Sequence, residues 1–539
     1  MEKAEWFLQE DIKKFIIGTL GKESWVVVYQ NANTDNQVIF FYSVLVPNSE
    51  VDEVLDRIEF DFEYPYFGLP VVEQDPENQN QAIYLRFGVS SGLEPLILVR
   101  DFHSVKPSYT EVSQEFIHFH NLYYDTSKNR YIKIHNDGRE EEVIIISDNE
   151  IKVKLKHMKQ FLAFKDMCLG IYFETTRFID VNAEDIGLQK GGADFDQREG
   201  LYHFGFWYRN EQHFFNKNKA FSRLLGKKVI VGMRKEDTGI YPFEEKKNYQ
   251  EFIIGQDENG KDVVYTCNPD RLANFFGKNP EAPQFVTPVF FSKDVLRKYY
   301  DDPDKFSVED GYLRCGGLWG LRMDNHHDDY VIVLLGDLGY LSHDEQLYWR
   351  HFNIPPAGTF SETIFKRYFL AEFAEPETVD LVFASKFEQV QEKWNEKFGW
   401  NMFKPLNDGD EYHLTGLRVP LKNTQMEFDS QVLSLTKVII DSLNEQELRK
   451  FVAEDISNLK GISKLEKYLA ANGFKGYEDH IKFLRNLQEL RSTGSAHRKS
   501  DSYLKVAKEF GLDKKIFIES FTEILKKAIV FLDYLESNL

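Results

Sequence analysis

Cysteine is scarce in this chain of 539 residues, which limits the chemistry that can be built on thiols. Cys168, Cys267 and Cys315 lie far apart and form no CxxC pair, so neither a zinc ribbon nor a disulfide-rich secreted domain is expected. A sparse, odd number of cysteines is typical of a reducing compartment. We therefore expect a cytoplasmic protein with no metal centre.

Long apolar runs and an excess of basic residues are also missing. No run approaches the ~20 apolar residues of a membrane-spanning helix, and the acidic start of the chain does not look like a signal peptide. The formal net charge of -21 argues against broad coating of nucleic acid, because phosphate binding relies on Lys and Arg. Neither GxxxxGK[ST] nor GxGxxG occurs, so we expect no nucleotide-hydrolysing engine and no cofactor.

The composition that remains is that of a large globular protein. Hydrophobic residues make up 42% and aromatic residues 15% of the chain, enough for sizeable cores. The length indicates several domains. We predict an α+β protein with three regions, which are a β-rich N-terminal domain (1–160), a mixed α/β middle region (161–425) and a C-terminal helical bundle (426–539).

Local patterns support this division. Residues 37–46 are rich in β-branched and aromatic side chains, and the alternating run 130–135 is followed by AsnAspGly, which predicts a hairpin. The apolar run 330–339 is strand-like. In the C-terminal region apolar residues recur at helical spacing, most clearly over 517–535, which predicts a long amphipathic helix.

An arginine and a histidine near the C-terminus carry the strongest functional signal. Arg491 and His497 lie in the run LeuArgSerThrGlySerAlaHisArg (490–498), at the end of a predicted helix. Between Arg491 and Lys515 there are seven basic and three acidic residues, so the local net charge is +4. The pair offers one proton-transfer group and one fixed cation, which suit phosphodiester cleavage.

The same Arg and His spacing occurs elsewhere by chance. Three further pairs have four intervening residues, and they are Arg130 with His135, Arg198 with His203, and Arg322 with His327. We expect these pairs in strands and loops, whereas the C-terminal pair alone lies in an all-helical segment. The sequence therefore favours Arg491 and His497.

Around this motif the chain resembles the HEPN superfamily, whose nucleases carry Arg-x(4–6)-His in a helical bundle. It is most similar to ApeA-type bacterial phage-defence proteins, in which a long β-containing region precedes the bundle. The resemblance covers about 430–539 and rests on ArgSerThrGlySerAlaHisArg. HEPN nucleases often have Asn, Asp or His after the Arg, whereas this chain has Ser492.

The resemblance implies metal-independent RNA cleavage, with tRNA as a candidate substrate. His497 would move a proton and Arg491 would stabilise charge developing on the phosphate. Ser492, Arg498 and Lys499 would bind the RNA. HEPN nucleases typically build one site from two protomers, so a dimer through the C-terminal bundle is expected, with residues 517–535 as its seam. The alternative is that this stripe packs only within its own bundle.

The rest of the chain is expected to sense a trigger or to restrain RNA cleavage. From Leu443 to Leu539 there are 17 Lys and Arg against 15 Asp and Glu, a net of +2, which leaves -23 for the remainder. An acidic region could keep RNA from the basic site until a phage-derived trigger acts. The alternative is a non-catalytic sensor or scaffold whose helical domain only dimerises.

Three other groups of side chains were weighed as sites. HisHisAspAsp (326–329) reads as a solvated loop rather than a metal cluster, because four consecutive residues do not easily converge on one ion. Asp324 and Asp337 could be paired carboxylates but stand at strand ends. An aromatic group could stack nucleotides, although core packing is the more common role of such residues. Its members are His203, Trp207, Tyr208, His213 and Phe215.

Overall fold

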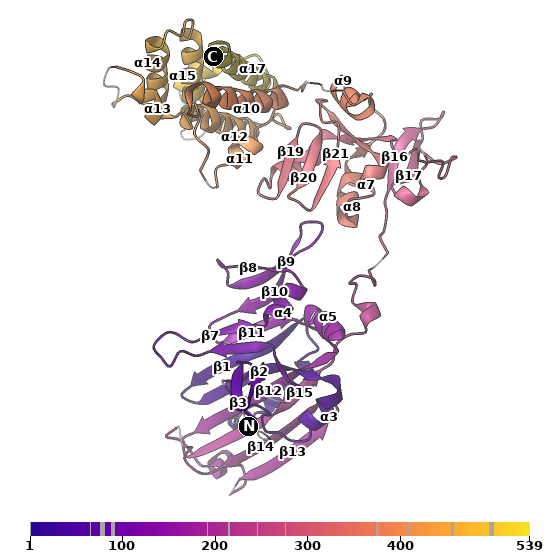
Figure 1. The fold of residues 1–539 in the computed structure, drawn as a ribbon, viewed down its shortest axis with the longest axis vertical. Coiled ribbons are helices and arrows are strands. Elements are labelled where there is room, and N and C mark those ends of the chain that lie inside the picture. Colours follow the sequence, from indigo (N-terminus) through magenta and orange to yellow (C-terminus); the bar gives the residue numbers. More distant parts are fainter. Residues whose placement is uncertain are drawn as a thin grey trace. The chain divides into compact units, whose positions relative to one another are not determined.

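The structure is a computed structural model, and its described residues form two compact units. Residues 1–135 and 139–246 make the first unit, and residues 136–138 and 247–539 make the second (Figure 1). The first contains a large antiparallel sheet and the second ends in helices, in agreement with the predicted α+β class. The residues not described are 1, 65, 76–80, 88–91, 191, 214–215, 245, 275, 373, 375, 377, 408, 454–457 and 495–500.

The first unit is organised around an eleven-stranded antiparallel sheet in the described part of the chain. Its strand order is β13-β14-β15-β12-β2-β1-β11-β10-β9-β8, and β5 pairs with β2. The strands are β1 (Trp25–Thr34), β2 (Gln37–Pro47), β5 (Glu94–Pro95), β8 (Leu122–Asp125), β9 (Arg130–Ile134), β10 (Glu140–Ile146), β11 (Glu150–Lys154), β12 (Met167–Ile179), β13 (Ala193–Glu199), β14 (Tyr202–Arg209) and β15 (Ala220–Ile230).

The sheet does not stop at residue 160, where the sequence suggested a boundary. β12 pairs along its length with β2 on one side and β15 on the other, and nearly all of its residues are buried. A strand that is covered on both faces loses the polar alternation that marks a half-exposed strand. This explains why the sequence between 161 and 246 looked mixed although it completes the N-terminal sheet.

Short elements complete the first unit around this sheet. The predicted hairpin is present, since β9 pairs with β10 across residues 135–139. Two further hairpins join β3 (Val71–Gln74) with β4 (Ala82–Leu85), and β6 (Ile97–Arg100) with β7 (Tyr109–Val112). The helices are α1 (Glu2–Phe7), α2 (Glu10–Lys14), α3 (Val51–Val54), α4 (Gln114–Phe119) and α5 (Leu155–Lys165).

The second unit begins with a mixed region built from small sheets. Its core is rich in aromatic side chains, with Trp349 and Tyr299 fully buried. The apolar run 330–339 was expected to be one strand, but only β22 is extended and the chain then turns into α7. The elements are β16 (Glu251–Gln256), β17 (Asp262–Thr266), β18 (Pro288–Ser292), α6 (Arg297–Tyr300), β19 (Phe306–Glu309), β20 (Tyr312–Cys315), β21 (Trp319–Arg322), β22 (Tyr330–Leu334), α7 (Leu335–Leu338), α8 (His343–His351), β23 (Asn353–Ile354) and α9 (Glu362–Phe365).

A helical bundle with one continuous core follows. A π-helical turn, η8 (Lys437–Asp441), continues α12. The long final helix predicted from its apolar spacing is present as α17. The helices are α10 (Val379–Phe398), α11 (Tyr412–Thr415), α12 (Gln425–Thr436), α13 (Glu445–Lys450), α14 (Gly461–Ala471), α15 (Glu478–Gly494), α16 (Asp501–Glu509) and α17 (Phe517–Ser537).

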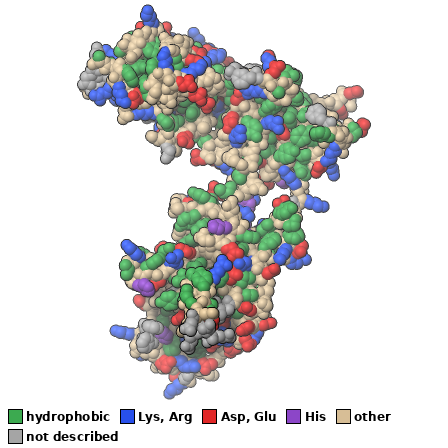
Figure 2. Space-filling model, in the orientation of Figure 1, with side chains coloured by type: hydrophobic (Ala, Val, Ile, Leu, Met, Phe, Trp, Pro, Cys, Tyr) green, Lys and Arg blue, Asp and Glu red, His purple; other side chains and the backbone are tan. Residues whose placement is uncertain are grey.

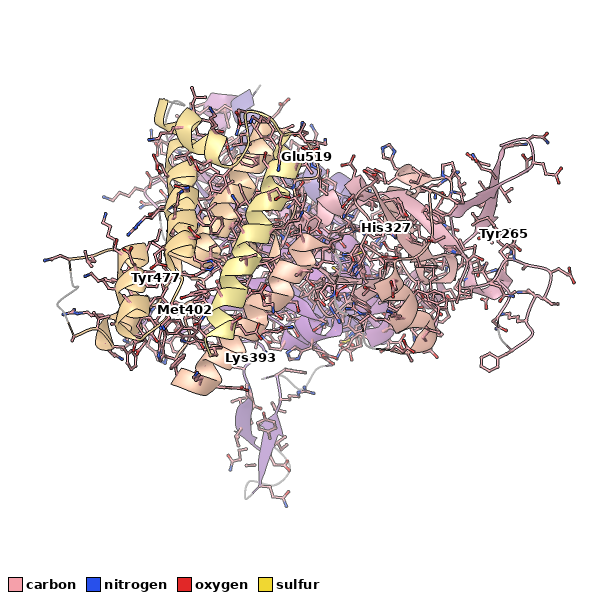
Figure 3. All side chains as sticks on the ribbon, turned by 90° about the horizontal axis from the view of Figure 1, so that it is seen from above. Tyr265, His327, Lys393, Met402, Tyr477 and Glu519 are labelled. Atoms are coloured by element: carbon pink, nitrogen blue, oxygen red, sulfur yellow. The ribbon has the colours of Figure 1, made fainter. Side chains whose placement is uncertain are left out.

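Helix α10 belongs to this bundle although it precedes residue 426. Figure 3 shows it beside α17, with Glu519 near the start of α17 and Lys393 near the end of α10. Lys386 Nζ lies 2.9 Å from Glu536 Oε2, and Lys393 also pairs with Glu536. Trp394 on α10 is fully buried in the bundle core. The helical domain therefore begins before the boundary that the sequence suggested.

The apolar stripe of α17 is covered within its own chain. Phe521, Ile524, Ala528, Phe531 and Leu535 are fully buried in the bundle core. The expectation that this stripe forms the seam of a dimer is therefore wrong, because its side chains already pack against helices of the same protomer. A dimer through another surface of the bundle stays a prediction.

None of the helices in the described part of the chain combines the length and the apolar character needed to cross a bilayer.

Candidate functional site

Helix α15 places Arg491 at the edge of the helical bundle. Ile481, Leu484, Leu487 and Leu490 recur every three residues, and each is at most 2% exposed. Each step of three residues is close to one helical turn, so consecutive members adjoin along a stripe that winds slowly around the helix and packs into the core. Arg491 follows in the last turn, where a cation also interacts favourably with the helix dipole.

The guanidinium of Arg491 lies against a carboxylate. Its Nη1 is 3.3 Å from Asp441 Oδ2, and the two side chains are 30% and 33% exposed. Asp441 ends η8, a π-helical turn of a kind that recurs at functional sites. Because both groups reach solvent, a phosphate could approach the guanidinium and compete with Asp441.

A second ion pair and a buried histidine lie nearby. Lys437, at the start of η8, has its Nζ 3.1 Å from Asp410 Oδ2. His413 on α11 is 3% exposed, and its Nδ1 is 2.9 Å from Ser434 Oγ. Arg491, Asp441, Lys437, Asp410 and His413 are called the Arg491 cluster below.

The environment of His413 favours a neutral imidazole. Burial lowers the pKa of His413, and the Lys437 cation lowers it further, while the Asp410 carboxylate acts in the opposite direction. The charges of Arg491 and Asp441 also act on this ring, which shows that it lies close to them. The sequence did not point to His413, because it precedes the helical region and belongs to no motif.

The remaining predicted site residues follow Arg491 along the chain. Ser492 is exposed, and its hydroxyl donates to the Glu489 carbonyl in the preceding turn at 3.1 Å. His497, Arg498 and Lys499 lie outside the described residues. The structure thus gives the surroundings of Arg491 and Ser492 and leaves the other three assignments as predictions.

The pair Arg130 and His135 is held by carboxylates in the β9–β10 hairpin. Arg130 Nε lies 2.9 Å from Asp125 Oδ2, and its Nη1 also pairs with Glu142. His135 Nε2 is 2.9 Å from Glu141 Oε2. Both members of the pair therefore have carboxylate partners that account for their positions.

Of the other two pairs, one lies on paired strands and one joins a strand to a loop. Arg198 and His203 face each other across β13 and β14, and His203 Nε2 is 3.1 Å from Asp196 Oδ1. The ring of His327 stacks on Tyr330 at 4.2 Å between centroids. Arg322, the last residue of β21, is exposed. As expected from the sequence, none of these pairs sits at the end of a bundle helix.

The acidic and histidine-rich segment 324–329 forms a hydrogen-bonded network. Asp324 is fully buried and accepts hydrogen bonds from the backbone N–H of Ser361 at 2.6 Å and from its hydroxyl at 3.0 Å. His326 Nε2 is 2.6 Å from Asp310 Oδ1. Within the described ranges, no three His, Cys, Asp or Glu side chains are placed to hold a metal ion. A structural role accounts for these contacts.

The aromatic group on β14 is mainly core. His203 and Tyr208 are 7% and 3% exposed, and the guanidinium carbon of Arg223 lies 5.2 Å from the ring centroid of Trp207. His213 packs near Phe221, with 5.0 Å between ring centroids. Phe215 lies outside the described residues. These contacts agree with core packing rather than with an open stacking platform.

A cleft of about 960 Å³ lies elsewhere in the second unit. Its walls carry both signs of charge, which include Lys515 and Lys526 but also Glu519 and Glu523. Figure 2 likewise shows acidic and basic side chains interspersed over the visible face of the molecule. The Arg491 cluster does not line this cleft, and the side chains of Arg491 and Asp441 are 30% and 33% exposed.

No family model matches the chain, and neither a curated protein nor a solved structure matches it.

Proposed function

We propose that the helical bundle is a metal-independent endoribonuclease in which Arg491 and His497 act together. The observation that carries this proposal is the position of Arg491. Its side chain is 30% exposed in the last turn of α15, and the segment bearing His497 follows directly in the sequence. A partly exposed guanidinium can bind a phosphate while the buried face of its helix keeps it in place.

The proposed chemistry divides the work between the two residues. His497 moves a proton, either from the attacking 2′-hydroxyl or to the leaving 5′-oxygen. Arg491 exchanges its contact with Asp441 for the phosphate and stabilises the charge that develops on it. Ser492, Arg498 and Lys499 bind the flanking RNA.

In this proposal the protein is a cytoplasmic antiviral ribonuclease of the HEPN type, with RNA such as tRNA as its substrate. Two protomers combine through the helical bundle, using a surface other than the buried stripe of α17. The β-rich region senses a phage-derived trigger or restrains cleavage. The acidic balance of the remainder, -23 against +2 for 443–539, supports a restraining role.

The ion pair with Asp441 favours a second candidate. An Arg that bridges two helices through a carboxylate can serve structure alone, and the helical bundle would then be a non-catalytic scaffold. In that case His497 would have no role in RNA chemistry.

Incubation of the purified full-length protein with total RNA in EDTA distinguishes the two functions. We expect cleavage that persists in the chelator, with products ending in 2′,3′-cyclic phosphate or 3′-phosphate, because the 2′-hydroxyl is the attacking group. Adding the lysate of phage-infected cells tests for a trigger. An inert protein that still oligomerises under both conditions favours the scaffold.

A further inference from the structure

A second concave surface lies in the first unit and is independent of the proposed ribonuclease. It is a cleft of about 740 Å³ on the large sheet, lined by residues of β1, β8, β9 and β11 and by the β6–β7 hairpin. These strands are labelled in the N-terminal unit of Figure 1. The cleft contains five tyrosines, which are Tyr29, Tyr64, Tyr109, Tyr124 and Tyr131. It is called the tyrosine cleft below.

Two of these tyrosines present exposed rings. Tyr109 is 49% and Tyr124 is 40% exposed, although a large aromatic ring is usually better covered. Tyr124 and Tyr131 are cross-strand partners on β8 and β9, with 4.7 Å between their ring centroids. Their positions give the cleft an aromatic wall that is open to a ligand.

Hydrogen bonds fix this wall before any ligand arrives. The Tyr124 hydroxyl donates to Asn129 Oδ1 at 2.6 Å, and Asn129 Nδ2 donates to the Ile146 carbonyl at 3.1 Å. On the floor, the hydroxyls of Tyr29 and Tyr64 lie 3.5 Å apart. A preorganised aromatic surface loses little conformational entropy on binding.

The charge in the tyrosine cleft has one sign among the residues that the structure describes. Asp101, Glu111 and Asp148 line it, and the described lining contains no Lys, Arg or His. Asp101 accepts a hydrogen bond from the Ser108 hydroxyl at 2.7 Å, and Glu111 lies 3.5 Å from Arg100, which does not line the cleft. Asp148 is exposed in the turn between β10 and β11. Phosphate-bearing ligands are therefore disfavoured by charge.

We propose that the tyrosine cleft binds an arginine- or lysine-containing segment of a protein partner. Tyrosine faces attract guanidinium and ammonium groups, and carboxylates at the rim pair with them. The net charge of -21 also attracts a basic partner over a distance. The cleft volume of about 740 Å³ accommodates side chains of a peptide rather than one small ion.

A fluorescent octapeptide in which Arg alternates with Gly is a suitable probe, and the same peptide with citrulline in place of Arg is its control. Citrulline keeps the length and planar shape of the side chain but replaces one guanidinium nitrogen by a carbonyl oxygen and removes the charge. Anisotropy with the full-length protein at about 0.15 M salt suppresses nonspecific attraction to the acidic surface. We expect the Arg peptide to bind at least about fivefold more tightly than the citrulline peptide.

Matched variants locate the binding. Tyr124→Ala removes a ring from the cleft, whereas Tyr123→Ala removes the neighbouring ring on β8, which is 60% exposed and does not line the cleft. Asp148→Asn and Asp180→Asn each remove one exposed negative charge, but only Asp148 lines the cleft. We expect Tyr124→Ala and Asp148→Asn each to weaken the Arg peptide by about fivefold, with little change in the two controls.

The outcomes decide the proposal. Equal binding of the Arg and citrulline peptides overturns it, as does an equal loss in Tyr123→Ala and Tyr124→Ala. If Tyr124→Ala does not fold, Tyr109→Ala provides the same comparison with an exposed ring on the other wall. Binding of a neutral oligosaccharide such as chitotetraose that Tyr124→Ala abolishes, without binding of the Arg peptide, also overturns it and assigns the cleft to glycans.

Discussion

Arg130 in the N-terminal sheet and Arg491 in the helical bundle differ in what surrounds them, although each precedes a histidine at similar spacing. The Arg130 side chain is 17% exposed and lies between Asp125 and Glu142. The Arg491 side chain is 30% exposed at a helix end, 3.3 Å from Asp441. The hairpin holds its cation between strands, whereas the helix end presents its cation near the surface.

The comparison shows that spacing alone does not identify a site. In the hairpin, the Glu141 carboxylate contacts His135, His157 and Lys154. These contacts account for the position of His135 without a catalytic role. At the helix end, the element that carries Arg491 is fixed by its buried face, while the side chains of Arg491 and Ser492 reach solvent. The following changes test whether this difference has functional consequences.

Replacement of the two histidines should give the largest contrast. His497→Ala removes the proposed proton carrier and should lower RNA cleavage by at least ~10²-fold. His135→Ala should leave the cleavage rate unchanged, because this side chain serves the hairpin. Initial rates on RNA in EDTA measure the effect, with circular dichroism as a check of folding. A folded and fully active His497→Ala protein would remove the nuclease proposal and favour the scaffold.

The two arginines should separate in the same direction. Arg491→Ala should lower cleavage by about 10²-fold, and Arg491→Lys should restore little because Lys lacks the planar guanidinium. Arg130→Ala should leave cleavage intact but destabilise the hairpin, since it leaves Asp125 and Glu142 without their cation. Rates together with thermal unfolding distinguish the two effects. Full rescue by Arg491→Lys would show that charge alone is sufficient.

The core of the helical bundle should respond to a small change. Ile524→Val removes one buried methylene group from α17 and should cost about 1 kcal/mol in free energy of unfolding. Val530 lies on the same helix and is 56% exposed, so Val530→Ala should cost less than about 0.5 kcal/mol. Urea denaturation measures both. A change in molar mass by light scattering with Ile524→Val would instead indicate that the stripe takes part in association.

The last difference concerns pH and belongs to the hairpin side of the comparison. Burial and the neighbouring His157 lower the pKa of His120 to about 3. In the unfolded chain the His120 side chain binds a proton near pH 6.5, whereas in the folded chain it stays neutral down to a much lower pH. The free energy of unfolding should therefore fall as the pH drops below about 6.5. Burial also lowers the pKa of His157, and the Glu141 carboxylate acts in the opposite direction.

His120→Gln keeps a donor for the His157 carbonyl, which lies 2.9 Å from His120 Nε2, and removes the titrating group. The loss of stability between pH 8 and pH 5 should therefore be smaller in His120→Gln than in the natural protein. The exposed His118→Gln serves as a control and should leave the slope unchanged. Equal slopes in all three proteins would rule out His120 as a source of the acid sensitivity.

Elements with one polar and one apolar face were predictable from the sequence. The stripe at 517–535 predicted α17, and AsnAspGly predicted the β9–β10 turn, because both patterns follow directly from backbone geometry. The same rule would have found α10, where Phe383, Phe387, Val390 and Trp394 recur at helical spacing. In contrast, the run 330–339, in which Asp337 is the one charged residue, carried no periodicity that could separate β22 from α7.

Only those residues of the candidate site that are neighbours in the sequence were predictable. Arg491 and Ser492 adjoin in the sequence, and the helical pattern placed them at a helix end. Asp441 and His413 come from η8 and α11, and only tertiary packing brings them near Arg491. No local pattern records such long-range proximity.

Helix α10 also decides where the helical domain can be separated from the rest of the chain. A fragment that starts at residue 426 lacks Phe383, Phe387, Val390 and Trp394, and the apolar surface that they cover on α17 and its neighbours would face water. Such a fragment would aggregate whether or not the acidic region restrains it. If the β-rich region restrains cleavage, the isolated helical domain should be more toxic to cells than the full chain. That comparison is informative only with a fragment that begins before Val379, so that α10 remains in the core.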